Sequence, residues 1–204
     1  MSEEELMAAV IRGDQLAYQT LVRAHLPAIN RYTQRLLGGG RDTEDIAQET
    51  FLRLWTTAAR WDPDKAKLST WLHRIAHNLC IDFLRKQKRV VLTASFDENN
   101  PIEGEITPSS NEGALRSAIV ERSEQQPSSA DNIEQEEELN ALHSALATLS
   151  EAQRSAILLC HFQGFSNKEA AAIMNVSVQA LESLIARAKR GLRAQLEATR
   201  NEDT

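Results

Sequence analysis

An acidic segment near the middle of the chain limits the possible folds more than any other feature. Residues 91–138 contain twelve acidic side chains and two basic ones, and no hydrophobic periodicity is sustained across residues 92–132. This stretch also contains turn-forming runs such as Pro127-Ser128-Ser129. A segment of this composition cannot bury enough apolar surface to form a core. We therefore expect two folded domains, residues 1–91 and 133–204, joined by a long acidic flexible linker over residues 92–132.

Charge is divided unevenly between this segment and the rest of the chain. The 204 residues carry a formal net charge of −6, of which residues 91–138 contribute −10, so the other residues carry +4. The overall acidity therefore does not exclude nucleic-acid binding by the flanking domains. Such asymmetry indicates a division of roles along the chain.

Hydrophobic periodicity predicts helices throughout residues 1–91. Each predicted helix follows a side chain that can accept hydrogen bonds from the free backbone N–H groups of a first turn. These caps are Ser2 (in a capping box with Glu5), Asp14, Asp42 and Ser69. The helices are expected to end near Gly13, Leu37, Trp55 and Val90, with a loop over residues 57–68.

The same rules predict helices over residues 133–204. A first helix is expected from about Ile133 to Thr148. Further caps are Ser150 with Gln153, Ser166 with Glu169, and Ser177. Asn175 tolerates the left-handed conformation that a tight turn before the last helix requires. The predicted fold class is all-α, with two small helical domains.

Residues 166–193 have the pattern of a helix-turn-helix. In the last helix the apolar residues share one face: Leu181, Leu184, Ile185, Ala188 and Leu192. Polar residues lie opposite: Gln179, Ser183, Arg187 and Arg190. Early polar side chains of a groove-reading helix can reach base edges, whereas later cations, here including Lys189 and Arg193, suit phosphates. The alternative is a helical hairpin with a solvated basic face.

The helix predicted from Ser69 has a similar division. Its predicted core stripe is Leu72, Ile75, Ala76, Leu79 and Phe83, and the opposite face carries Arg74, His77, Asn78, Arg85, Lys88 and Arg89. Trp55, Trp61 and Trp71 precede or open this helix, with Lys65 and Lys67 between them. Aromatic rings beside cations suit unstacked bases. The alternatives are a solvated helix face and core tryptophans.

The helix over residues 42–55 combines large apolar residues with Asp45, Gln48, Glu49 and Arg53. Apolar anchors with a charged rim favour a protein-binding surface. The alternative is an ordinary amphipathic core helix.

Little in the sequence indicates catalysis, a metal or a membrane span. His73, His77 and Cys80 have helical spacing but lack further ligands at metal-site spacing, and Cys80 and Cys160 suit reduced core thiols. There is no nucleophile–base pair or phosphate-binding glycine loop, so we expect no enzyme activity and no cofactor. No apolar run is long enough to span a bilayer, and the acidic N-terminus differs from a signal peptide, which predicts a cytoplasmic protein.

Three segments together resemble the extracytoplasmic-function (ECF) subfamily of bacterial sigma factors. They are DTEDIAQETFLRLW at 42–55, STWLHRIAHNLCIDFLRKQKR at 69–89, and the stretch at 149–193 that contains SNKEAAAIMNVSVQALESLIARAKRGLR. The resemblance covers about residues 14–90 and 135–198. It implies that residues 1–91 are sigma region 2 and that residues 133–204 are sigma region 4.

The resemblance also implies roles for individual residues. Docking on the polymerase is implied for Asp45, Ile46, Gln48, Glu49, Phe51, Leu52, Arg53 and Trp55. Recognition and melting of the minus-ten element are implied for Trp61, Lys65, Lys67, Ser69, Thr70, Trp71, Arg74, His77, Asn78, Asp82, Arg85, Lys86, Lys88 and Arg89. Recognition of the minus-thirty-five element is implied for Ser166, Lys168, Ser177, Val178, Gln179, Ser183, Arg187, Lys189 and Arg190.

The implied protein is a non-enzymatic subunit that binds the clamp and flap regions of RNA polymerase core and promoter DNA. An anti-sigma factor, often membrane-bound in this family, is a further implied partner. Two features depart from the family pattern: the linker is long, and Glu182 stands where many members carry Lys. The alternatives are a helix-turn-helix regulator that acts without core polymerase and a metal-dependent helical enzyme using His73 and His77.

The acidic linker yields a first prediction. Replacing its acidic residues by amides is expected to raise the affinity of the isolated protein for DNA, because the negative segment competes with DNA for the basic surfaces. Fluorescence anisotropy with a duplex oligonucleotide measures this affinity, and an unchanged value would contradict the expectation.

Overall fold

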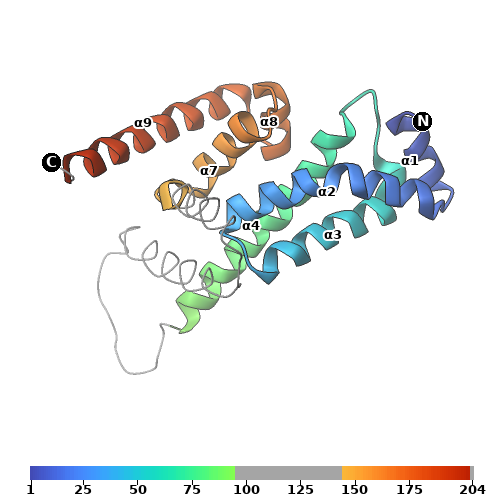
Figure 1. Ribbon diagram of the computed structural model, residues 1–204, viewed down its shortest axis with the longest axis horizontal. Coiled ribbons are helices and arrows are strands. Elements are labelled where there is room, and N and C mark those ends of the chain that lie inside the picture. The colour runs from blue at the N-terminus through green and yellow to red at the C-terminus, as the bar shows by residue number, and fades with distance from the viewer. Residues whose placement is uncertain (95–143, 203–204) are drawn as a thin grey trace, which may run out of the picture.

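The computed structural model describes residues 1–94 and 144–202, and regular structure in these ranges is entirely helical (Figure 1). The all-α prediction is confirmed. Most of the predicted linker and the predicted helix start at Ile133 lie outside the described residues; residues 144–147 are helical.

The N-terminal part contains four α-helices and a short 3₁₀ turn. These are α1 (Glu3–Ile11), α2 (Gln15–Leu37), α3 (Arg41–Thr57), η1 (Ala58–Arg60) and α4 (Leu68–Ala94). Two predicted caps are confirmed. Ser2 and Glu5 form the capping box of α1, and Asp14 Oδ1 accepts hydrogen bonds from the N–H groups of Leu16 and Ala17 at 2.9 and 3.1 Å.

Two predicted caps are wrong. Gly40, with φ of 97°, precedes α3 without any side-chain cap, so Asp42 lies inside the first turn, where its charge still suits the helix dipole. The N–H of Trp71 donates to the carbonyl of Lys67 at 3.1 Å, so α4 has already begun before Ser69. Both errors are shifts of one or two residues at a helix start.

The C-terminal part contains α7 (Glu151–Ile157), the π-helical turn η3 (Leu158–Phe162), α8 (Asn167–Met174) and α9 (Val178–Glu202). The capping boxes of Ser150 with Gln153 and Ser166 with Glu169 are both present, and Ser177 Oγ accepts from the N–H of Ala180 at 3.1 Å. Asn175 has φ of 55°, the predicted left-handed turn. Local sequence signals therefore determine this part well.

The α4 helix is buried on more sides than its predicted stripe allows. It packs against α2 and α3, and also against α8 from the C-terminal part. His73 and His77 are consequently buried, whereas Phe83 and Leu79 are only partly so. Its fully buried apolar side chains in residues 68–84 are Leu68, Leu72, Ala76, Cys80 and Leu84. The prediction that His77 lies on the exposed basic face is wrong for this structure, because α2 covers that position.

The two parts form one packed body in which α7 and α8 lie beside α2 and α4 (Figure 1). Among the helices of residues 1–94 and 144–202, none combines the length and apolarity needed to cross a membrane.

The burial of His77 predicts a pH dependence of stability. Its Nδ1 shares a 2.9 Å hydrogen bond with the Tyr32 hydroxyl, and burial lowers its pKa from 6.5 to about 4. Between these pH values the unfolded chain binds more protons than the folded one, so the free energy of unfolding decreases as pH falls through this window. The expected loss attributable to His77 reaches about 3 kcal/mol.

Urea unfolding of wild type and His77→Asn between pH 7 and pH 4 checks this prediction. The variant should show the weaker pH dependence, although it is less stable at pH 7. Equal slopes for the two proteins would contradict it.

Candidate nucleic-acid and protein interfaces

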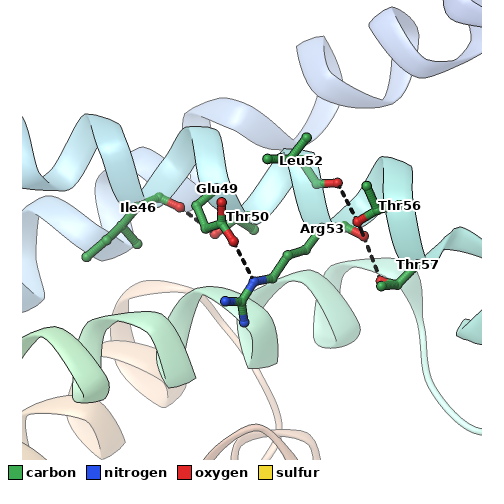
Figure 2. A network of polar contacts seen from close by, with 7 residues as sticks. All are labelled: Ile46, Glu49, Thr50, Leu52, Arg53, Thr56 and Thr57. Carbon is green, nitrogen blue, oxygen red and sulfur yellow. Dashed lines mark hydrogen bonds and ion pairs between the residues drawn. The ribbon is translucent and has the colours of Figure 1, made fainter.

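An exposed strip on α3 is the candidate protein-binding surface. Asp45, Gln48, Leu52 and Arg53 are exposed and Glu49 partly so, because spacings of three and four residues place them on one helical face. Figure 2 shows Glu49 and Arg53 joined across one turn, with Glu49 Oε1 2.8 Å from Arg53 Nε. Leu52 is 53% exposed, an apolar group with charged neighbours.

The other predicted residues of α3 support this strip from behind. Ile46 and Phe51 are only 7% and 4% exposed and belong to the core. The Trp55 ring packs edge-on against Tyr18, with 5.1 Å between ring centroids, and the Tyr18 hydroxyl donates to the carbonyl of Phe51. Direct contact with a partner is therefore open to the exposed residues, whereas Ile46 and Phe51 hold the helix in place.

The exposed side of α4 is the first candidate nucleic-acid surface. A shallow hollow on it is lined by Asp82, Arg85, Lys86 and Arg89. The exposed predicted residues of this helix are Arg74, Asn78, Asp82, Arg85, Lys86, Lys88 and Arg89. Five of these seven are cationic, which suits a phosphate backbone. Of the predicted residues here, Thr70 and His77 are buried.

The loop before α4 is held by its own side chains. The Trp61 indole N–H donates to the carbonyl of Ala66 at 3.0 Å, and Lys65 Nζ lies 2.8 Å from the Asp62 carboxylate. The hydrogen-bonded ion pair with Lys65, together with the hydrogen bond that the Asp64 N–H donates to Asp62 Oδ1, lowers the pKa of Asp62. Trp61 and Trp71 are partly buried against the core, which fits the alternative of core tryptophans, whereas stacking of a base on either ring stays a prediction.

The second candidate nucleic-acid surface lies on α8 and α9. Every predicted residue is exposed: Ser166, Lys168, Ser177, Val178, Gln179, Ser183, Arg187, Lys189 and Arg190. Behind them, Leu181 and Ala188 are buried, which confirms the predicted division of α9. Glu182 Oε1 accepts a 3.4 Å hydrogen bond from Asn167 Nδ2, so this acid interacts with α8.

The possible metal ligands have other partners. The Nδ1 of His73 lies 2.8 Å from the carbonyl of Ser69, and His77 bonds to Tyr32. Burial raises the pKa of the Cys80 thiol to about 12, so the thiol stays protonated. Across residues 1–94 and 144–202, no group of three or more His, Cys, Asp or Glu side chains could hold a metal ion.

Sequence reasoning missed the residues that join the two parts. Glu169 Oε1 lies 3.0 Å from Lys67 Nζ, and Glu151 Oε1 lies 2.9 Å from Lys88 Nζ. The hydrogen bonds from Ser166 and the pairing with Lys67 together lower the pKa of Glu169 to about 2. Glu151 and Glu169 lie in the first turns of α7 and α8, where acidic residues are common in any helix. No sequence signal therefore indicated that they also pair with lysines of the N-terminal part.

Comparison with known proteins agrees with this arrangement. Residues 21–90 match Sigma-70 region 2, and residues 139–192 match Sigma-70, region 4. The ECF RNA polymerase sigma factor SigW of Bacillus subtilis is 30% identical over 92% of this chain and 92% of its own length. The ECF RNA polymerase sigma factor SigE of Mycolicibacterium smegmatis is 30% identical over 90% of this chain, which spans only 64% of that relative.

A solved structure, that of CnrH in complex with the cytosolic domain of CnrY, is 27% identical with a TM-score of 0.65. The match covers 96% of this chain and 97% of the CnrH-complex chain. With two matched sigma regions on an all-helical fold and relatives of this kind, the chain belongs to the ECF subfamily of RNA polymerase sigma factors, which are non-enzymatic initiation factors.

Proposed function

We propose that this sigma factor binds RNA polymerase core through the exposed strip of α3 and presents two basic surfaces to promoter DNA. The observation that carries the proposal is this combination: an apolar group with a charged rim on one helix, and cationic faces on two others. Residues 1–91 would act on the polymerase and the minus-ten element, and residues 133–204 on the minus-thirty-five element. This work takes place in the cytoplasm, where the polymerase is.

Reading of the minus-thirty-five element falls to the start of α9. Gln179 and Ser183 lie at its exposed N-terminal end, as in other helices that enter a major groove. Gln can pair with a base edge, whereas Arg187, Lys189 and Arg190 further along suit phosphates. The region 4 match supports this assignment.

Opening of the minus-ten element falls to α4 and its preceding loop. Each base-pair step that melts costs about 0.6–2.2 kcal/mol of stacking. Stacking of a freed base on an aromatic ring returns about 1–3 kcal/mol. Trp61 and Trp71 supply such rings, and Arg74, Arg85 and Arg89 supply cations for the displaced strand.

A protein that restrains this sigma factor is a further part of the proposal. The solved CnrH structure contains the cytosolic domain of a second protein, CnrY. By the resemblance to its family, this chain would be held by an anti-sigma factor, a partner that is often membrane-bound in this family.

Reconstituted transcription tests the proposal. Purified protein and bacterial core polymerase, with core alone as control, should give specific transcripts from a pool of promoter fragments. Leu52→Asp is expected to lower core affinity and transcript yield at least about tenfold, because a charge replaces the apolar centre of the strip. Leu16→Asp is the matched control, since Leu16 is 74% exposed but lies on α2 outside the strip. Duplex binding without any affinity for core would instead favour the regulator alternative.

Single substitutions in α9 separate base reading from phosphate binding. Gln179→Ala should cost about 1–3 kcal/mol on the preferred sequence and little on its base-substituted variants. Arg187→Ala should weaken binding to all of these sequences alike and reduce the salt slope by about one. Holoenzyme binding to a set of promoters with single base changes measures both. If Gln179→Ala weakened all sequences equally, base reading by Gln179 would be refuted.

A further inference from the structure

The exposed start of α9 carries an acidic side chain, Glu182, among residues that suit DNA. Glu182 is exposed and follows Val178 by four positions and Gln179 by three, so these side chains are neighbours on one side of the helix. Val178 is 40% exposed, an apolar group that the fold leaves largely uncovered. The side of α9 that is assigned to base edges therefore includes a carboxylate.

Two hydrogen bonds help to set the direction of this carboxylate. Glu182 Oε1 accepts from Asn167 Nδ2, at the start of α8, at 3.4 Å. The Oδ1 atom of the same amide accepts from the Cys160 thiol at 3.8 Å, which leaves the amide nitrogen turned toward Glu182. Within residues 1–94 and 144–202, Glu182 forms no ion pair with a cation. Its charge therefore remains available to a donor outside the protein.

The major groove offers few donors to such a group. A carboxylate only accepts hydrogen bonds. Guanine presents N7 and O6 as acceptors and thymine presents O4, whereas the donors are the amino groups at N4 of cytosine and N6 of adenine. The adenine amino group lies beside the accepting N7 of its own base, and cytosine has no such acceptor. Cytosine is therefore the base that a carboxylate on a reading helix selects.

The same charge disfavours every other placement of the helix. A carboxylate beside phosphates weakens binding to any sequence, and a carboxylate opposite an accepting base edge is repelled. The interaction becomes favourable only where a base donates. An acid at this position therefore separates right from wrong sequences mainly by penalising the wrong ones.

We propose that Glu182 makes a cytosine necessary at one position of the minus-thirty-five element, with Asn167 as the positioning residue that holds its carboxylate. This inference rests on the proposed function, because it assigns a base preference to the reading helix α9. It gives the acid within this basic surface a task of its own, the rejection of promoters that carry another base at that position.

Substitutions in the protein and in the promoter test this contact together. Holoenzyme assembled from the full chain and bacterial core polymerase is bound to a promoter that it transcribes, and to single-base-pair variants across the upstream element. Wild type should lose about fivefold or more in affinity when one particular cytosine is replaced by any other base. Glu182→Gln should lose the discrimination at that position and keep it elsewhere, because an amide both donates and accepts.

A base analogue localises the contact to one amino group. In 2-pyrimidinone a hydrogen replaces the 4-amino group of cytosine. Placed at the selected position, it should weaken wild-type binding about fivefold more than it weakens binding by Glu182→Gln. The comparison cancels the loss of base pairing, which both proteins experience alike. Asn167→Ala should show a smaller loss of discrimination at the same position and none elsewhere.

Glu4→Gln is the matched control. It removes the same charge from an exposed position on α1, away from the reading helix, and should leave every base preference unchanged.

The outcomes separate this inference from the proposed function. If Glu182→Gln weakens binding to all upstream variants by the same factor, Glu182 only joins α9 to α8 and the inference is overturned. Specific transcription by a wild-type holoenzyme that needs no cytosine in the upstream element also overturns it, whatever the variants do. If wild type gives no specific transcripts with core, the proposed function fails, and this inference fails with it.

Discussion

The packing of α4 between the N-terminal helices and α8 is the constraint on which the rest of the structure depends. Its His77 faces α2 through Tyr32, while His73 contacts Tyr32 on one side and Phe165 on the other. A helix covered on two sides keeps only a narrow strip in solvent. The charged residues of α4 are confined to that strip, which gives the nucleic-acid surface its direction and concentrates its charge.

The same packing explains why the buried histidines of α4, which could otherwise bind a metal ion or transfer a proton, already have other partners. A buried polar group is costly unless it is hydrogen-bonded. His77 and Tyr32 satisfy each other, and the His73 ring bonds to the carbonyl of Ser69. Burial lowers the pKa of both histidines, so both rings are neutral near pH 7. The sequence spacing that suggested a metal site instead belongs to a polar patch within a helical interface.

Much of the fold could be predicted because its determinants are local. The capping boxes at Ser2, Ser150 and Ser166 involve residues three positions apart, and the two faces of α9 follow from helical periodicity. The direction of burial on α4 could not be predicted, since it depends on α2, which covers His77, and on α8, which is distant in the chain. A polar residue such as His77 has the same sequence pattern whether it faces solvent or is covered by another helix. The two cases cannot be told apart when the covering residue, here Tyr32, is itself able to form a hydrogen bond.

In the candidate site, too, the features set by local sequence could be predicted and those set by tertiary contacts could not. Residue types indicated the exposed strip of α3 and the basic faces, but Ile46 and Phe51 proved to be core residues because an apolar residue on an amphipathic helix fits either role. No pattern in the sequence predicts the ion pair between Lys67 and Glu169. An ion pair needs only two charges close in space, and an exposed Lys before a helix and a Glu in a helix first turn are both ordinary local choices.

The polar and aromatic contacts between the two parts are individually weak. Arg154 donates to Leu146, Ala147 and Leu149 within its own part, and these three bonds do not depend on its bond to Leu36 across the boundary. The guanidinium would remain largely satisfied without that bond. Partly exposed ion pairs contribute about 0–1 kcal/mol each, and an edge-on ring pair about 0.5–1.5 kcal/mol. A few such terms hold the parts together, yet a protein interface of ordinary size can outweigh them, since its hot spots alone contribute about 2 kcal/mol or more each. The polar and aromatic contacts across the boundary are therefore individually weak, and they add to the apolar packing of α8 on α4.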